Sequence, residues 1–261
     1  MSLLEVERLN KSFGGVVAAR DVSFSVERGE LIAIIGPNGA GKSTTFNMVG
    51  GQLAADSGTV RLDSEAITGL PPRAIWRRGL ARTFQIAQTF PSMSAAENVQ
   101  VALASLNGHT YAPWQPATTL HRAEALALLA PVGLRAAADR MVGELTYGDI
   151  KRVELAIALS SEPKLLLMDE PAAGMAPRER TALMALAATI ARERAIGVLF
   201  TEHDMDTVFA FATRVLVLVR GEIIAAGPPE AVRADPRVRE VYLGDMGLKA
   251  GRGEPARGAP P

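Results

Sequence analysis

The chain has 261 residues, 28 lysines and arginines against 28 aspartates and glutamates, and no cysteine. This length suits one compact core with a sizeable lobe, and the lack of cysteine excludes a disulfide scaffold and thiolate-bound metals. The balanced charge argues against extensive nucleic-acid binding. No apolar run approaches the ~18 residues of a membrane span, and the first residues lack the basic-then-apolar order of a signal peptide. We therefore expect a cytoplasmic protein.

The first predicted elements are strands. Apolar and polar residues alternate over Leu3–Leu9 and Val22–Glu27, which predicts half-buried antiparallel strands. The wholly apolar run Leu31–Ile35 predicts a strand that is covered on both faces. A glycine-rich turn follows, and after it a helix is expected from about Lys42.

Further apolar runs predict strands at Leu165–Met168, Gly197–Phe200 and Val215–Val219, and the last continues through Arg220–Glu222 into a hairpin. The middle of the chain is predicted to be helical, apart from a polar, proline-bearing loop at 107–119. We therefore expect an α/β fold in which a mostly parallel sheet with an antiparallel flank is interrupted by an all-helical lobe.

The expected division of the chain follows from this alternation. The α/β core takes residues 1–85 and 161–246, and the helical lobe takes residues 86–160. The end of the chain, residues 247–261, is rich in Gly, Pro and Arg, a composition typical of a disordered tail.

A phosphate-binding pattern, G-x-x-x-x-G-K-[ST], lies between the buried strand and the expected helix. Its residues are Gly36, Pro37, Asn38, Gly39, Ala40, Gly41, Lys42, Ser43 and Thr44. The glycines let successive backbone N–H groups turn inward around an anion, and the helix directs the positive end of its dipole at the phosphates. Lys42 is expected to neutralise the β/γ charge, and the Ser43 hydroxyl to bind Mg²⁺.

Two carboxylates, Asp169 and Glu170, end the strand predicted at Leu165–Met168. Ligands gather at the carboxyl ends of parallel strands, so Asp169 is predicted to hold Mg²⁺. Glu170 is placed to orient or deprotonate an attacking water. Such carboxylates can also simply cap the next helix, an interpretation that the phosphate-binding pattern disfavours.

Two further residues strengthen the prediction. His203 follows the strand Gly197–Phe200 and would emerge at the same sheet edge, where it could contact the γ-phosphate. Gln85 lies where the core gives way to the lobe and could sense the metal or the water. Taken alone, a single histidine more often has no functional role. A solvent-exposed position would explain the presence of the glutamine equally well.

The decisive pattern is Leu145-Thr146-Tyr147-Gly148-Asp149, which opens a helical stretch at 150–159. This pattern lies after the phosphate-binding pattern and before the acidic pair. The order of these motifs resembles that of the ATP-binding-cassette (ABC) ATPases, and the resemblance covers about residues 3–245. It implies that Thr146, Tyr147 and Gly148 belong to the signature motif, which caps the γ-phosphate of an ATP held by the opposing subunit. The physical reason is a helix N-terminus directed at an anion.

The same resemblance assigns roles to the other motifs. Residues 36–44 correspond to the Walker A loop, Asp169 to the Walker B aspartate, Glu170 to the catalytic glutamate and His203 to the switch histidine. Gln85 corresponds to the Q-loop residue that couples the nucleotide and its metal to the membrane partner. Phe13 matches the aromatic residue that stacks on adenine, since a base offers a π-face to an aromatic ring.

A set of shorter matches resembles the ATP-binding subunits of branched-chain amino-acid importers. These matches are Phe13-Gly14-Gly15, Thr83-Phe84-Gln85, Glu97-Asn98, the Leu-x-Tyr-Gly signature, Glu170 to Gly174, Glu202 to Met205 and Tyr242-Leu243-Gly244. The resemblance implies ATP hydrolysis that powers uptake, a second cassette that is its own copy or a sister subunit, two permease subunits and, indirectly, an external solute-binding protein. It also implies a position on the inner face of the cell membrane.

Other functions fit the sequence less well. A non-transport cassette in DNA repair or translation usually carries fused cassettes, zinc-binding cysteines or long inserts, and this chain has one cassette and no cysteine. A P-loop kinase or GTPase does not account for the signature motif. An ATP-gated module without catalysis requires a further defect, and uptake of amides or urea stays open.

Two departures from the family pattern supply the only candidates for such a defect. Asp149 replaces the glutamine that normally closes the signature, and Ala176 stands where the family usually has Asn or Asp. We expect Asp149 to slow the site that this signature completes. The four arginines 73, 77, 78 and 82 are interpreted mainly as a solvated helix face, although they could touch lipid headgroups or a permease.

Overall fold

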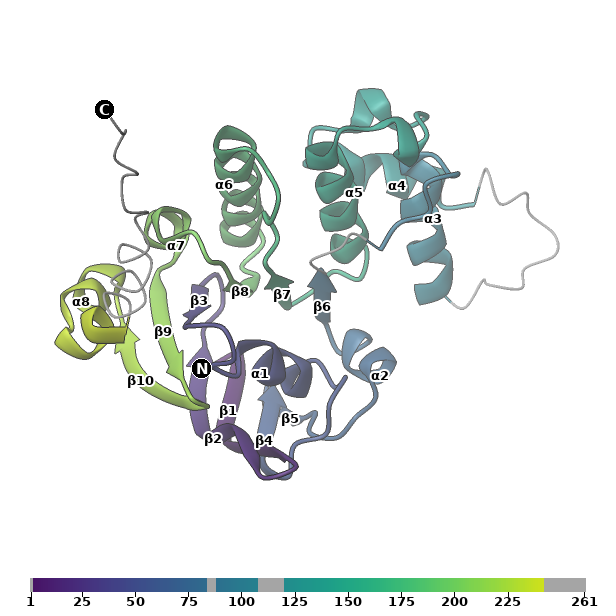
Figure 1. Ribbon diagram of the computed structural model, residues 1–261. Helices are drawn as coiled ribbons and strands as arrows, with labels where there is room; N and C mark the ends of the chain where they lie inside the picture. Colours follow the sequence, from purple (N-terminus) through teal and green to yellow (C-terminus); the bar gives the residue numbers. More distant parts are fainter. Residues whose placement is uncertain (1, 84–87, 108–119, 242–261) are drawn as a thin grey trace, which may run out of the picture.

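The computed structural model describes residues 2–83, 88–107 and 120–241. Its first sheet is antiparallel and has the order β2-β1-β4-β5 (Figure 1). The strands are β1 (Leu4–Phe13), β2 (Val16–Val26), β4 (Ser57–Leu62) and β5 (Glu65–Ala66). The predicted antiparallel flank is therefore confirmed.

The β1–β2 hairpin is longer than predicted. The chain turns at Gly14 and Gly15, both at positive φ, so pairing continues from Leu4 opposite Val26 to Phe13 opposite Val16. The register shifts at three places after Val6. Because each shift interrupts the alternation of faces along a strand, the pattern in the sequence ends near residue 9 although the strand does not.

The second sheet has the order β10-β9-β3-β8-β7-β6. Its strands are β3 (Leu31–Ile35), β6 (Leu80–Thr83), β7 (Leu165–Asp169), β8 (Gly197–Thr201), β9 (Arg214–Val219) and β10 (Glu222–Gly227). All neighbouring pairs are parallel except β9–β10, which form the predicted hairpin. The mostly parallel sheet predicted from the apolar runs is confirmed.

Alternate residues of the central strands feed two hydrophobic clusters. On β3, Leu31, Ala33 and Ile35 face one cluster, and Ile32 and Ile34 face the other. The second cluster lies between the two sheets and includes residues of helix α1 (Lys42–Val49). This two-sided burial, worth about 1.5–3 kcal/mol for each large side chain, explains why the strand is apolar throughout.

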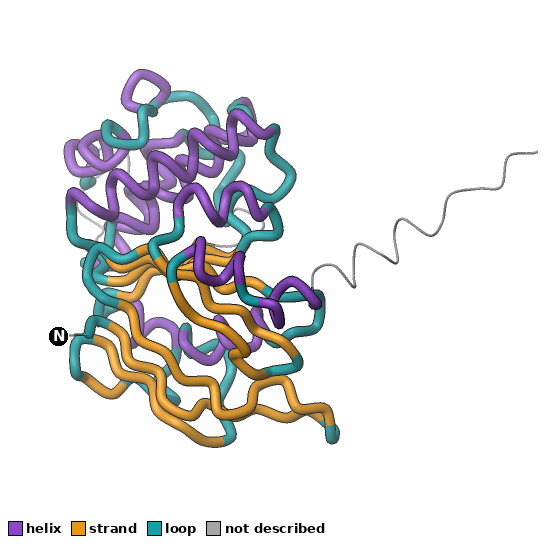
Figure 2. Tube along the Cα trace, turned by 90° about the vertical axis from the view of Figure 1, so that its left-hand side faces the viewer, coloured by secondary structure: helices purple, strands orange, loops and turns teal. Residues whose placement is uncertain are grey.

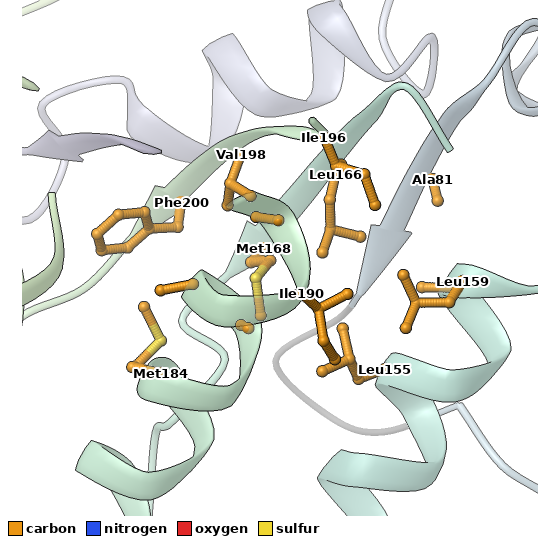
Figure 3. Close-up of a cluster of buried hydrophobic side chains, with 14 of the residues drawn as sticks. Ala81, Leu155, Leu159, Leu166, Met168, Met184, Ile190, Ile196, Val198 and Phe200 are labelled. Carbon is orange, nitrogen blue, oxygen red and sulfur yellow. The ribbon is translucent and has the colours of Figure 1, made fainter. Parts of the chain in front are cut away.

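The first cluster joins the large sheet to the helices on its other face. Figure 3 shows Leu166, Met168 and Val198 of the strands against side chains of α5 (Tyr147–Leu159) and α6 (Pro177–Glu193). Figure 2 shows this helical layer above the strands. The helices that follow the motifs are therefore fixed against the sheet that carries the acidic pair.

The remaining helices lie beyond β6 or beside β9 and β10. Helices α3 (Ala95–Leu106), α4 (Arg122–Leu129) and α5 form the group predicted as helical, with two 3₁₀ turns at Arg135–Ala137 and Val142–Glu144. The other helices are α2 (Pro72–Trp76), α7 (Met205–Phe211) and α8 (Pro229–Ala234). In the described part of 86–160, pairing of β type is limited to one isolated bridge, between Ser94 and Met141.

Some expectations were incomplete, and one was wrong. The sequence pattern did not predict β4, β5 or β6, which are short strands with few apolar residues. Arg82, which is predicted to lie on a solvated helix face, instead lies in β6, and its side chain is only 10% exposed. Arg73, Arg77 and Arg78 are exposed in and after α2, as expected.

The boundaries of the core at 1–85 and 161–246 and of the lobe at 86–160 stay a prediction. The tail 247–261 and most of the loop 107–119 lie outside the described residues. Among the helices that the structure describes, none combines the length and the apolar character needed to cross a membrane.

Candidate active site

The phosphate-binding pattern forms a loop from the end of β3 to the start of α1, and its glycines are required by close backbone contacts. A Cβ on Gly36 would lie 2.0 Å from the carbonyl oxygen of Leu218, and a Cβ on Gly41 would lie 2.1 Å from that of Ala18. Gly41 is also the N-cap of α1, at φ 100°. Gly39 has φ +78° with open space around it. The loop therefore follows the path of an anion-binding turn at a helix N-terminus.

Lys42, the first residue of α1, is folded back over this loop. Its Nζ donates to the carbonyl oxygens of Gly36 at 2.7 Å and Pro37 at 3.1 Å. Burial lowers the pKa of Lys42, while the nearby negative charges of Glu170 and Asp169 oppose that shift. The lysine is thus held where the loop and the acidic pair meet, and the next residue, Ser43, is exposed.

Asp169 ends β7, and each of its carboxylate oxygens accepts a hydrogen bond. Oδ1 accepts from the Thr201 hydroxyl at 2.8 Å, and Oδ2 accepts from Arg82 Nη2 at 3.1 Å. Arg82 also donates to the side-chain oxygens of Asn47 at 2.8 Å and Gln52 at 3.0 Å. The Asp169 side chain is 19% exposed, so it is oriented from both sides and still reaches the surface.

Sequence reasoning missed both partners of Asp169. Thr201 lies at the end of β8, and Arg82 lies near the end of β6. A polar residue at the carboxyl end of a predicted parallel strand was the available signal for Thr201. For Arg82 there was no such signal, because β6 was not predicted.

Glu170 and His203 are in direct contact. His203 Nε2 lies 2.7 Å from Glu170 Oε1, and the histidine side chain is 52% exposed. Glu170 has φ 47°, the left-handed region that a non-glycine residue rarely adopts. Such a conformation persists only where the surroundings hold it. Here its backbone N–H donates to the Thr201 hydroxyl at 3.0 Å and to the Thr201 carbonyl at 3.2 Å.

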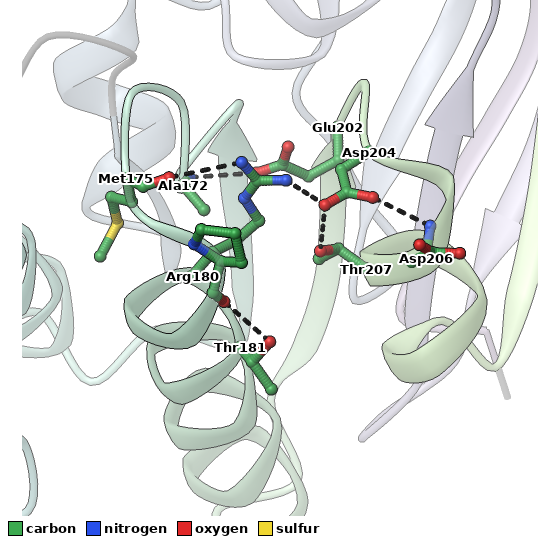
Figure 4. A network of polar contacts seen from close by, with 9 residues as sticks. Ala172, Met175, Arg180, Thr181, Glu202, Asp204, Asp206 and Thr207 are labelled. Atoms are coloured by element: carbon green, nitrogen blue, oxygen red, sulfur yellow. Dashed lines mark hydrogen bonds and ion pairs between the residues drawn. The ribbon is translucent and has the colours of Figure 1, made fainter.

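A second polar network joins the segments that follow β7 and β8 (Figure 4). The buried Glu202 accepts from the backbone N–H of Ala172 at 3.0 Å, and burial raises the pKa of its carboxyl group. Arg180 pairs with Asp204. Burial alone would raise the pKa of Asp204, but hydrogen bonds from Arg180, from a backbone N–H and from Thr207 bring it below its usual value.

The signature residues lie at the N-terminus of α5. Thr146 is the N-cap, and its hydroxyl accepts from the backbone N–H of Asp149 at 3.2 Å. Thr146 and Tyr147 are exposed, whereas Gly148 is buried, and a Cβ added there would lie 3.5 Å from the Met175 side chain. The predicted helix begins at Tyr147, three residues earlier than expected, and it presents its N-terminus at the surface.

The two departures from the family pattern differ in their local structure. Asp149 lies in the first turn of α5 with Oδ1 3.7 Å from Arg152 Nη1. Ala176 is the N-cap of α6 and supplies no side-chain hydrogen bond to it. An Asn or Asp at that position would supply the missing acceptor.

The last expected nucleotide contact is an aromatic side chain. Phe13 ends β1, is 47% exposed and has Lys11 Nζ 5.5 Å from its ring centroid. The Phe13 ring is therefore accessible to a flat ligand. Gln85, expected to sense the metal, lies outside the described residues.

Mg²⁺ prefers oxygen ligands and is usually bound by one or two carboxylates together with phosphate oxygens and waters. The Asp169 carboxylate and the Ser43 hydroxyl are donors of this kind, and both reach the surface near Lys42. The residues therefore fit a magnesium ion that is shared with a phosphate ligand.

Comparison with known proteins matches the family suggested by the motifs. Residues 19–173 match the ABC transporter family, and residues 222–247 match the branched-chain amino acid ATP-binding cassette transporter family. The high-affinity branched-chain amino acid transport ATP-binding protein BraF of Pseudomonas aeruginosa is 39% identical over 250 residues, covering 93% of this chain and 98% of that protein. The corresponding protein LivG of Escherichia coli is 36% identical over the same shares.

Two further similarities complete the comparison. The lipopolysaccharide export system ATP-binding protein LptB of Acidithiobacillus ferridurans is 39% identical over 244 residues, covering 94% of this chain and 98% of that protein. The crystal structure of MJ1267, an ATP-binding cassette of an ABC transporter in its ADP conformation, has a TM-score of 0.83 and 34% identity, covering 94% of this chain and 99% of that one.

The fold and the site thus define an ABC-type ATPase of the P-loop class. The chain belongs to the ATP-binding proteins of ABC transporters, within the branched-chain amino acid transporter family. Its reaction is the hydrolysis of ATP that powers transport. These matches do not support the alternatives, which were a P-loop kinase, a GTPase and a cassette protein of DNA repair or translation.

Proposed function

We propose that this chain drives the uptake of branched-chain or related amino acids. The observation that carries the proposal is the match of residues 222–247 to the branched-chain amino acid cassette family, beside the likeness to BraF over nearly the whole chain. Overall identity does not separate this function from lipopolysaccharide export, since LptB is equally similar. The match at 222–247 favours the amino-acid carriers.

In the proposed site, Lys42 and the backbone N–H groups of residues 36–44 bind the triphosphate, and Phe13 stacks on the adenine. Lys42 is already held over the loop by two carbonyl oxygens, from which it can turn to a phosphate with little rearrangement. Ser43 and Asp169, together with Gln85, would hold Mg²⁺. When bound, the ion would supply positive charge that neutralises the phosphate oxygens.

Glu170 is proposed as the general base for the attacking water, and His203 as its partner. Their 2.7 Å contact restrains both side chains, and the imidazole, which is 52% exposed, is accessible to a phosphate oxygen. Catalysis then consists mainly of positioning and of charge stabilisation by fixed groups. The acid–base contribution of one such residue is typically about 10²–10⁴-fold.

The proposed partners follow from the same family. A second cassette, either a copy of this chain or a sister subunit, would receive Thr146, Tyr147 and Gly148 against the γ-phosphate of its ATP. The exposed N-terminus of α5 supports this arrangement. Two permease subunits would hold the pair on the inner face of the membrane, and an external solute-binding protein would deliver the solute.

The catalytic part is tested by Glu170→Gln, which preserves size and one acceptor oxygen but removes the basic carboxylate. We expect the variant to bind Mg²⁺–ATP and to hydrolyse it about 10²–10⁴-fold more slowly. Turnover near that of the parent would refute the assignment of Glu170.

The transport part is tested by removing the gene from its host and measuring uptake of radiolabelled leucine, isoleucine and valine. Uptake of a labelled amide and of urea is measured beside them. Loss of branched-chain uptake supports the proposal. Unchanged branched-chain uptake, with loss of another solute, would reassign the substrate.

A further inference from the structure

The proposed base and its histidine partner lie on two different segments, one after β7 and one after β8. The segments start side by side, because β7 and β8 are paired up to Asp169 opposite Thr201. Beyond the strands, the backbone N–H of Ala172 donates to Glu202 Oε1 at 3.0 Å. The residue immediately before His203 is therefore tied to the segment that carries Glu170.

Arg180 makes the corresponding connection on the other side of the histidine. It lies in the first turn of α6 and pairs with Asp204, the residue immediately after His203 (Figure 4). Its Nη2 also reaches the carbonyl oxygen of Met175 at 3.4 Å. Figure 4 shows the guanidinium group between the loop of Met175 and the start of α7.

Asp204 is itself held by its own helix. Its side chain is the N-cap of α7 and accepts from the backbone N–H of Asp206 at 3.0 Å and from the Thr207 hydroxyl at 3.2 Å. A charge-assisted pair between two partly buried groups, with Arg180 23% and Asp204 30% exposed, is stronger than a surface pair. Arg180 therefore links α6, the loop before it and α7 through one side chain.

We propose that Arg180 is a positioning residue for ATP hydrolysis, which holds the segment of His203 in register with Glu170. The imidazole of His203 is 52% exposed, while its two sequence neighbours, Glu202 and Asp204, are each anchored to the opposite segment. The proposal rests on the roles proposed above for Glu170 and His203. It assigns Arg180 no contact with the nucleotide.

A positioning role and a purely structural role of Arg180 in supporting α6 and α7 predict different effects of a substitution on the kinetic constants. A 1 Å displacement of a catalytic group can lower a rate by about 10²-fold, whereas ATP binding relies on the loop at residues 36–44, to which Arg180 has no hydrogen bond in the described residues. Loss of positioning should therefore lower kcat and leave the KM for ATP nearly constant.

The experiment compares six variants of the full chain with Mg²⁺–ATP, and two of them are Asp204→Asn and the double variant Arg180→Gln/Asp204→Asn. Arg180→Gln removes the charge, and Arg180→Lys keeps it. Arg178→Gln removes an exposed arginine from the same helical turn and is the matched control. Glu170→Gln reports whether the catalytic assignment itself holds. Each variant is measured for kcat, for KM, for affinity toward a fluorescent ATP analogue and for thermal unfolding.

We expect Arg180→Gln to lower kcat about 10–100-fold, with KM and analogue affinity within about twofold of the parent. Arg180→Lys should recover part of this loss, and Arg178→Gln should resemble the parent. Asp204→Asn should lower kcat as well, and the Arg180→Gln/Asp204→Asn double variant should lose less than the product of the two single effects.

Three results would overturn the proposal. The first is a kcat of Arg180→Gln within about twofold of the parent, measured when Glu170→Gln is inactive. This result would refute the role of Arg180 and leave the assignment of Glu170 intact. Another is a parallel loss of kcat, analogue affinity and melting temperature without rescue by lysine, which indicates structural support only. Near-parental turnover of Glu170→Gln removes the basis of the inference whatever the arginine variants do.

Discussion

Adding one methyl group at Gly41 tests the geometry of the phosphate-binding loop. A Cβ at this position would lie 2.1 Å from the carbonyl oxygen of Ala18, a backbone atom of β2. The strand is held in the sheet and cannot withdraw freely. The left-handed backbone of Gly41, at φ +100°, costs an alanine about 1–3 kcal/mol. The clash adds about 1–3 kcal/mol of overpacking.

Gly41→Ala is therefore expected to lose about 2–6 kcal/mol of unfolding free energy. Gly39→Ala is the matched control, because Gly39 has φ +78° and open space around its Cβ position. It should lose only the backbone cost of about 1–3 kcal/mol. The difference corresponds to about 2–12 °C in melting temperature for a chain of this size.

Both variants are measured by equilibrium urea unfolding and by thermal unfolding, without nucleotide so that ligand stabilisation does not enter. A clearly lower stability of Gly41→Ala supports the close approach of the loop to β2. Equal losses in the two variants would refute the steric part of the reasoning.

Three further predictions concern charged groups. Arg82→Gln leaves the carboxylate of Asp169 without its guanidinium partner and should lose about 1–3 kcal/mol of unfolding free energy; an equal loss in the exposed control Arg73→Gln would contradict this. Asp149→Gln removes negative charge beside the proposed γ-phosphate cap, so ATP turnover at fixed Mg²⁺ should rise, and no rise counts against the idea. Because burial raises the pKa of Glu202 above its usual 4.5, its ionisation weakens the folded state as pH rises from that value. Glu202→Gln should therefore melt above the parent at pH 8 and close to it at pH 4.5, and a pH-independent difference would exclude this linkage.

Much of the fold and the site was predictable because the signals are local. The phosphate-binding residues stand at fixed spacing in one stretch of chain, directly between an apolar strand and a helix start. The central strands are buried on both faces, so their sequences are apolar throughout. The sequence shows that residues 36 and 41 are glycines, but it does not show the carbonyl groups that exclude a side chain at these positions.

Other features depend on partners that are distant in sequence. Strands β4 and β6 are short and only partly apolar, and they form because paired neighbours complete their hydrogen bonds. Arg82 resembles the exposed arginines before it in sequence. Its environment is set by Asp169, 87 residues away.

The sequence by itself determined which side chains are candidates for binding a triphosphate and a magnesium ion, and on which kind of element each stands. Only the tertiary structure decided which of them meet. Glu170 contacts His203, 33 residues later, because β7 pairs with β8 and not with another strand. That choice depends on the order of strands in the sheet, which the packing of both faces fixes and which no local pattern of residues encodes.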